Sequence, residues 1–218
     1  GIDLVGDKKK TWLPHLALGG VLISLAVSLY LIGVDLPGNT IFGGTTIFGG
    51  TLALDSFWLF FQIFASVAAG VVISSSFVYM QDRTFNPVEY YGLLLIATLA
   101  IGLLAASTDL ILIYVSFELL SVTSYILTGY LRDDPKSDEA AIKYFLYGAV
   151  ASAAMLYGMS FLYGISGSTN LAIIASSLLG DHTSMNWVVL PALVFMMVGF
   201  GYKIGAVPFH QWSPDAYE

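Results

Sequence analysis

Six apolar stretches of membrane-spanning length constrain this 218-residue chain more than any other feature. They cover residues 12–32, 56–79, 89–106, 109–130, 139–166 and 188–207. An α-helix needs about 20 apolar residues to cross the hydrocarbon core of a bilayer, where only helices or closed barrels satisfy their own backbone. The sequence therefore predicts an all-α, polytopic transmembrane helix bundle of about six spanning helices, forming a single transmembrane domain over residues 1–218.

The composition excludes several classes of function. Charged residues make up 11% of the chain, against about 25% in a soluble domain. The net charge of −7 gives no basic face for nucleic acid. The chain has no cysteine for an iron–sulfur cluster or a thiolate zinc site, and its three histidines lack the spacing of a ligand set. We therefore expect no metal site and no redox centre in this chain.

Basic residues outside the apolar stretches all fall on one side of the membrane if six helices span it. They are Lys8, Lys9, Lys10, Arg83, Arg132 and Lys136, and the loops on the opposite side (33–55, 107–108 and 167–187) have none. Cytoplasmic loops carry the excess of lysine and arginine in membrane proteins. The pattern therefore predicts a cytoplasmic N-terminus, which in an organelle would face the matrix or the stroma.

The loop 33–55 contains a short repeat. Ile41–Thr45 and Ile47–Thr51 both read IFGGT. Paired glycines between residues that favour strands are typical of β-hairpins. We expect a structural hairpin here, on the outer surface of the membrane.

Glu118 is a carboxylate at predicted membrane depth. It lies nine residues beyond Asp109, or about 13–14 Å along a helix, which is close to the midplane of the bilayer. A charge at the centre of a spanning helix costs at least about 2.5–3.5 kcal/mol. Residues with hydroxyl groups flank it at helical spacing on one face: Tyr114, Ser121 and Tyr125. This stripe could hold water and pass protons; the alternative is a structural carboxyl that ties two helices together.

Lys203 lies in the run GFGYKIGAVPFHQW, near the end of the last apolar stretch. Gly205 weakens a helix here and Pro208 removes a backbone donor, so we expect the last helix to be discontinuous. Broken helices at membrane depth line polar cavities in ion-handling transporters. A desolvated lysine in such a cavity can change its protonation state at modest cost. The alternative is a lysine that extends to the membrane interface.

Two more titratable residues are candidates for the same pathway. Lys143 lies about one turn into the fifth stretch and either extends to the interface or contributes to proton transfer. Beyond it, Gly148 and Ser152 form a small-residue face suited to close helix packing. His210, seven residues after Lys203, shares its face only if the helix continues, and is otherwise an interface residue. Together these residues indicate a path for protons or another cation.

Three motifs carry a resemblance to a known family. They are SYxLxGYLR and EAAIKYFLxGAxAS within Tyr114–Leu171, and KIGAVPFHxWxPDAYE at the end of the chain. These runs resemble the proton-translocating, antiporter-like subunit N (subunit 2) of respiratory complex I, the NADH:quinone oxidoreductase. The resemblance is dense from about Leu104 to Glu218 and looser before it.

The resemblance implies an antiporter-like fold of about fourteen helices with two inverted repeats. This chain would supply the N-terminal half, family helices two to seven. Glu118 then matches the key glutamate of helix five, Lys203 the key lysine of the discontinuous helix seven, and Lys143 a lysine of helix six. In that family the glutamate and lysine form a midmembrane pair whose switching moves H⁺ across the membrane, driven by quinone reduction elsewhere in the complex.

The same resemblance implies a role within an enzyme, as a translocase subunit of NADH:quinone oxidoreductase. NAD(H), flavin, iron–sulfur clusters and quinone would bind to other subunits. The expected partners are the other membrane subunits of the complex and the lipid bilayer. The expected location is the cell inner (cytoplasmic) membrane, or an organelle inner or thylakoid membrane in a eukaryote.

Two other readings remain open at this stage. One is a subunit of a multi-subunit Na⁺/H⁺ antiporter or of a membrane-bound hydrogenase, which use the same module. The other is a structural membrane scaffold, in which the buried charges only hold helices together. The scaffold predicts that neutralising Glu118 or Lys203 changes assembly and leaves the turnover of assembled complex unchanged.

Overall fold

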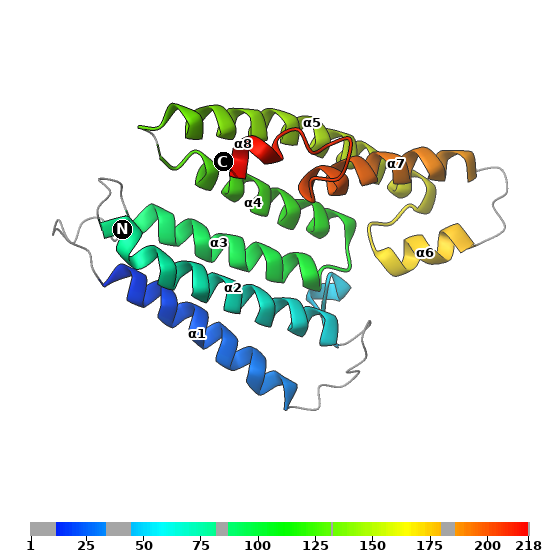
Figure 1. Cartoon of the computed structure of the whole chain (residues 1–218). Coiled ribbons are helices and arrows are strands. Elements are labelled where there is room, and N and C mark those ends of the chain that lie inside the picture. The colour runs from blue at the N-terminus through cyan, green and yellow to red at the C-terminus, as the bar shows by residue number, and fades with distance from the viewer. Residues whose placement is uncertain (1–11, 34–44, 82–86, 132, 180–185, 218) are drawn as a thin grey trace. The chain divides into compact units, whose positions relative to one another are not determined.

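The structure is a computed structural model that describes residues 12–33, 45–81, 87–131, 133–179 and 186–217. Its helices are arranged in two compact units (Figure 1). The first unit contains α1 (Leu13–Ile32), α2 (Ser56–Gln81) and α3 (Pro87–Ala106). The second contains α4 (Leu110–Thr128), α5 (Pro135–Ser166), α6 (Leu171–Leu179), α7 (Asn186–Lys203) and α8 (Ser213–Tyr217).

In the first unit, the three helices pack against one another around a small apolar core. Leu13, Val21 and Ile73 are among its buried members. A polar group lies inside the same unit: the Gln62 side-chain amide donates to the Ser24 hydroxyl at 2.9 Å, and Ser24 and Ser66 lie 3.4 Å apart. Side-chain hydrogen bonds between helices are a common means of joining spanning segments.

A two-stranded hairpin, β1 (Thr45–Ile47) and β2 (Leu52–Leu54), connects α1 and α2 in the chain. Its turn uses the second IFGGT copy, where Phe48, Gly49 and Gly50 all have positive φ. Two of these three positions are glycine, which adopts positive φ without steric cost. Residues 41–44 of the first copy lie outside the described residues.

In the second unit, α5 is the central helix and contacts α4, α6, α7 and α8. The chain marks its ends locally. The Asp134 side chain accepts a hydrogen bond from the Lys136 backbone N–H, Pro135 opens the helix, and Gly167 closes it with a φ of 67°. These are the residue types expected at an N-cap, a first helical position and a C-terminal turn.

The length of the helices and the apolar side chains on their exposed faces suit a lipid bilayer. Five of them (α1 to α5) are long and apolar enough to cross a membrane. Their outward faces remain apolar, as at Ile23, Tyr30 and Val150, each about 70% exposed. Large exposed apolar surfaces suit contact with lipid chains. The chain is therefore a multi-pass membrane protein with an all-α transmembrane bundle.

The structure differs from the expected boundaries in two places. The last span, expected over 188–207 with a discontinuity, forms α7 and breaks after Lys203; among the described residues five helices have full spanning length and α7 is shorter. Its end is fixed by Gly205, as described below. The segment 167–187, expected as a loop, contains α6, because the apolar run Leu171–Leu179 folds as a helix of nine residues.

The packing of α5 on α7 depends on Gly158. A Cβ at this position would lie 2.5 Å from the Ala192 carbonyl oxygen and 2.9 Å from the Met196 backbone nitrogen, both in α7. We expect Gly158→Ala to separate the two helices and to cost about 1–3 kcal/mol of stability. Thermal unfolding of the purified membrane protein in detergent measures this.

Gly164→Ala is the matched control. It lies in the same helix, where an added Cβ meets nothing within 4 Å. Its unfolding midpoint should equal or slightly exceed that of the parent, because alanine favours a helix over glycine. Equal losses in both variants would show that close approach at Gly158 is not the cause.

Candidate functional site

Glu118 lies at the middle of α4, and a side chain of α5 forms a hydrogen bond with its carboxylate. The Ser152 hydroxyl donates to Glu118 Oε1. The same Ser152 oxygen lies 3.1 Å from the Tyr114 hydroxyl, which is one turn before Glu118 on α4. The three groups form a continuous hydrogen-bonded series between two helices. A carboxylate in such a series can exchange a proton with hydroxyls or water beside it.

Lys203 is the last residue of α7, and the chain ends the helix there by a specific turn. Gly205 has a φ of 65°, the Gly205 N–H donates to the Tyr202 carbonyl at 3.0 Å, and the Ala206 N–H donates to the Gly201 carbonyl at 2.8 Å. This is a Schellman motif, which uses glycine at the left-handed position and satisfies terminal carbonyls. It places the Lys203 ammonium in the last turn, where the helix dipole favours a cation.

The Lys203 ammonium lies among oxygen atoms and rings of α4 and α5. Its Nζ is 3.3 Å from Ser124 Oγ and 3.2 Å from the Tyr144 hydroxyl. It also lies 5.6 Å from the centre of the Tyr144 ring and 6.0 Å from that of Tyr125. Aromatic faces attract a cation at this range. The side chain therefore points into the unit and contacts polar groups there.

Glu118 and Lys203 both lie in the second unit, and Lys203 reaches α4 at Ser124. Within the described part of the chain, however, no ion pair within 4.0 Å joins them. Ser124, which contacts Lys203, is six residues after Glu118, or about 9 Å farther along α4. The two charged groups are therefore not in direct contact, and Lys203 meets α4 beyond Glu118.

Four aromatic side chains pack together near the end of α7: Tyr125, Tyr144, Tyr202 and Trp212. The Tyr202 hydroxyl donates to the Tyr144 backbone carbonyl at 2.5 Å. The Tyr125 hydroxyl occupies the place that a Cβ would need at Gly148, so α5 must have glycine there for this ring to enter. These contacts hold the rings against one another, and two of them, Tyr125 and Tyr144, lie beside the Lys203 ammonium.

Most, but not all, of the residues predicted from the sequence lie in this site. Glu118, Tyr114, Tyr125 and Lys203 lie in the group just described, and Ser121 is buried on α4 between Glu118 and Ser124. Gly205 forms the turn that ends α7, and Pro208 lies in the connection beyond it. No group of three or more histidine or acidic side chains that could hold a metal occurs among the described residues.

His210 does not share a face with Lys203. The helix ends seven residues before it, so the condition on which that expectation depended is not met. The side chain is exposed, in the connection between α7 and α8.

Lys143 also lies apart from Glu118. It is eight residues beyond the start of α5, about two turns rather than one. Its ammonium is 2.9 Å from Asp215 Oδ2 in α8 and 2.7 Å from Glu139 Oε1 on its own helix. The structure thus connects Lys143 with the segment that follows Lys203 and leaves it outside the Glu118 series.

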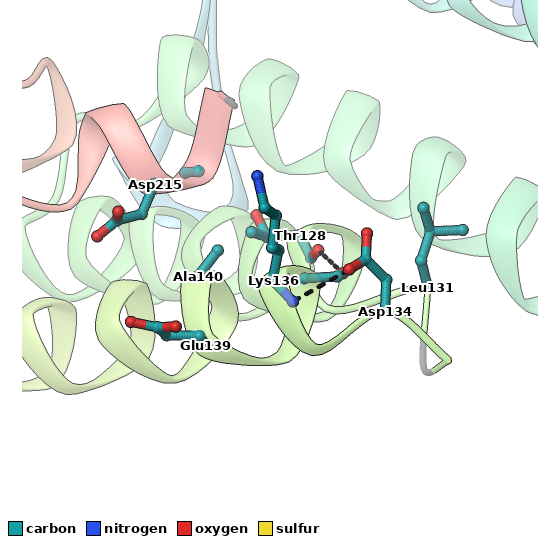
Figure 2. Close-up of a pocket in the computed structure, with 9 residues that line it drawn as sticks. Thr128, Leu131, Asp134, Lys136, Glu139, Ala140 and Asp215 are labelled. Carbon is teal, nitrogen blue, oxygen red and sulfur yellow. Dashed lines mark hydrogen bonds between the residues drawn. The ribbon is translucent and has the colours of Figure 1, made fainter.

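A cavity of about 340 Å³ lies beside this ion pair. Figure 2 shows Asp215 and Glu139 at one end and Asp134 and Leu131 at the other. Thr128, one turn beyond Ser124 on α4, lines the same cavity. A second cavity of about 570 Å³ lies at the opposite end of α4 and is lined by Leu110 and Tyr114 among others. Polar residues of the site therefore reach a cavity at each end of α4.

Several residues of the site were not predicted. Sequence reasoning placed Ser152 only on a packing face, and it did not single out Ser124, Tyr144, Tyr202 or Trp212. A signal exists for Ser124, because it lies one turn before Thr128 in a helix that carries hydroxyls at close spacing. No comparable signal marks Tyr144 or Trp212, because their proximity depends on the turn after Lys203.

Comparison with known proteins gives a family match over the second unit. The model of the NADH:quinone oxidoreductase/Mrp antiporter transmembrane family matches residues 107–218. Proteins named NAD(P)H-quinone oxidoreductase subunit 2 align along the whole chain. The one from Synechocystis sp. is 39% identical over 220 residues, and the one from Prochlorococcus marinus strain MIT 9312 is 41% identical over 221 residues. The chain covers 41% of each of these relatives.

Two solved structures share the fold. A structure of respiratory complex I from Thermus thermophilus with bound Aureothin contains a chain that matches 94% of this one, with a TM-score of 0.72 and 31% identity. A chain of the membrane-bound sulfane sulfur reductase, an archaeal respiratory membrane complex, matches 98% of it, with a TM-score of 0.80 and 22% identity. This chain covers 41% and 43% of those chains, respectively. The second likeness, at its lower identity, shows the fold alone.

The geometry predicts a spectroscopic effect of Ser152→Ala. Removing this hydroxyl deprives Glu118 of a hydrogen-bond donor, so the infrared band of the Glu118 carboxyl group should shift in position. The band is identified as the one that Glu118→Gln abolishes. Ser160→Ala is the control, because the Ser160 hydroxyl, also on α5, donates to the Tyr157 carbonyl of its own helix. A band that moves equally in both variants, or in neither, would contradict the Ser152 contact.

Proposed function

Because the chain belongs to the NADH:quinone oxidoreductase/Mrp antiporter transmembrane family, we propose that it forms part of a proton path in which Glu118 and Lys203 exchange charge. The observation that carries the proposal is the position of Lys203. Its ammonium lies inside the second unit at the broken end of α7 and contacts the hydroxyls of Ser124, on the same helix as Glu118, and of Tyr144.

The two charges act on each other through the protein interior. When Glu118 is ionised, its negative charge stabilises the ammonium form of Lys203. When Glu118 gains a proton or its charge is compensated from elsewhere, that stabilisation is lost and Lys203 can release a proton. The hydroxyls of Ser124 and Tyr144 are acceptors beside the ammonium, and Ser152 is a donor beside the carboxylate.

The energy for this exchange would come from a larger assembly. We propose that the chain is a segment of a membrane subunit of an NAD(P)H:quinone oxidoreductase, since relatives with that name align along its length. Moving one charge against a membrane potential of 100 mV costs about 2.3 kcal/mol. Quinone reduction on other subunits would supply this free energy, and the relatives' remaining 59–60% of length would supply the rest of the path.

Cofactors and location follow from the same proposal. The chain itself would hold no redox group, and NAD(H), flavin, iron–sulfur clusters and quinone would bind to other subunits. Its partners would be the other membrane subunits and the lipid bilayer. The distribution of lysine and arginine supports a cytoplasmic N-terminal side in a cell inner membrane, or the equivalent side of an organelle inner or thylakoid membrane.

The test changes each charge separately in the full-length parent. Glu118→Gln and Lys203→Ala should each lower NADH- or NADPH-driven proton uptake by membrane vesicles at least about tenfold per assembled complex, because each removes a group that transfers a proton. Glu89→Gln is the matched control, since Glu89 is exposed in the first turn of α3. It should leave proton uptake unchanged.

Other outcomes identify the competing functions. Unchanged proton uptake per assembled complex, with less complex assembled, would indicate a structural scaffold. Uptake of ²²Na⁺ that depends on Glu118 and Lys203, without proton uptake driven by NADH or NADPH, would indicate an antiporter subunit. Either result would overturn the proposal and leave the family membership intact.

A further inference from the structure

Trp212 is the buried aromatic residue of the connection that follows α7. Elsewhere in this connection Ile204 and Val207 are about 80% exposed, whereas Trp212 is only 5% exposed. Its indole N–H donates to the Tyr202 carbonyl at 3.0 Å, so the buried ring has its polar atom satisfied. The connection turns back after Gly205, and this brings Trp212 against the helix end that carries Lys203.

The Trp212 ring also supports Tyr144 on α5. The two rings are stacked, with centroids 4.2 Å apart and planes inclined by 13°. Tyr125 packs edge-on against Tyr144 at 4.6 Å. Tyr144 is therefore held between a ring of α4 and the ring of Trp212.

Lys203 depends on the position that these contacts give to Tyr144. The Tyr144 hydroxyl is one of two side-chain oxygens that accept from its ammonium, at 3.2 Å, and both distances are long for a charge-assisted hydrogen bond. Such contacts alone do not fix a flexible lysine. The backbone carbonyl that Trp212 binds belongs to Tyr202, the residue before Lys203. Trp212 thus acts on the position of Lys203 indirectly in two ways: it supports the Tyr144 ring, and it binds the end of α7.

We propose that Trp212 is a positioning residue for Lys203. By stacking on Tyr144 and binding the Tyr202 carbonyl, it holds the ammonium at the Tyr144 hydroxyl. The inference rests on the proposed function, since positioning has a measurable effect on transport only if Lys203 carries protons. It adds a residue with no ionisable group to the machinery of charge exchange.

A second anchor acts on the same segment. Asp215, three residues after Trp212, pairs with Lys143, and Lys143 directly precedes Tyr144 in α5. The connection after α7 is therefore fixed to two consecutive residues of one helix. This ion pair is partly exposed, with about 40% of each side chain accessible. The Trp212 stack is the buried contact of the two, and its partner Tyr144 lies beside the Lys203 ammonium.

The experiment compares pH profiles of proton uptake in assembled complex. The titratable groups that face Lys203 are Glu118 and Tyr125 from α4 and Tyr144 from α5, with Tyr202 beside it on α7. Trp212→Leu removes both the stack and the indole N–H. We expect the midpoint of the profile to move by about one pH unit toward lower pH, because the ammonium loses the hydroxyl that accepts from it. Trp212→Phe, which keeps a ring, should give a smaller shift.

Trp187→Leu is the matched control, because Trp187 lies at the other end of α7 and is exposed. It should leave the midpoint unchanged. A merely structural role for Trp212 would lower the amount or thermal stability of the complex and leave the midpoint of assembled complex where it is. An unchanged midpoint in both Trp212 variants would overturn the proposal. If the Trp212→Leu complex fails to assemble, the midpoint of Trp212→Phe alone decides.

The route through Tyr144 has its own test. Tyr144→Phe removes only the hydroxyl, and we expect it to shift the midpoint in the same direction. The double variant Tyr144→Phe/Trp212→Leu should shift it no further than the larger single change, because the two residues act in series. Fully additive shifts would overturn the route. If Lys203→Ala retains proton uptake, the proposed function fails; if it loses uptake while Trp212 variants behave as the parent, only the positioning role fails.

Discussion

The second unit depends on a helix, α7, that ends inside the unit with its terminal carbonyl groups paired. In lipid no water is available to satisfy them, so an interrupted helix needs partners from the protein itself. Gly205 supplies the left-handed turn, and the Tyr202 carbonyl accepts from both the Gly205 N–H and the indole of Trp212. Because these bonds are made, α7 can stop at Lys203 and present its ammonium to α4 and α5.

Around that helix end, polar groups are joined by hydroxyls rather than by a direct ion pair. Ser152 binds Glu118, while Ser124 and Tyr144 accept from Lys203. A buried pair in close contact would be stable in one charge state and costly to change. With hydroxyls as its partners, each charged group can gain or lose a proton while it remains hydrogen-bonded. This arrangement suits a site that changes charge during turnover better than one that only ties helices together.

The sequence predicted the elements of this site better than their contacts. Spanning length and the cost of buried charge placed Glu118 at the middle of α4 and singled out Lys203 and Gly205. The sequence did not predict the contacts of Ser152 and Tyr144. A spanning helix is apolar both toward lipid and toward protein, so the spacing of its apolar residues does not show which face packs on a neighbouring helix. Trp212 and His210 depended on the turn after Lys203. A continued helix would carry Trp212 about 13 Å onward, whereas the observed turn returns it to Tyr144.

The attachment of the α7–α8 connection to Lys143 and Tyr144 has a mechanical consequence. These are neighbours in the chain, yet one binds Asp215 at an accessible edge and the other touches the enclosed ammonium of Lys203. A displacement of α8 would therefore act on the turn of α5 that contains Lys143 and Tyr144. Because Tyr144 contacts Lys203 directly, the displacement would also change the surroundings of Lys203. The partly exposed ion pair of Lys143 and Asp215 is thus coupled through one turn of α5 to the position of Lys203.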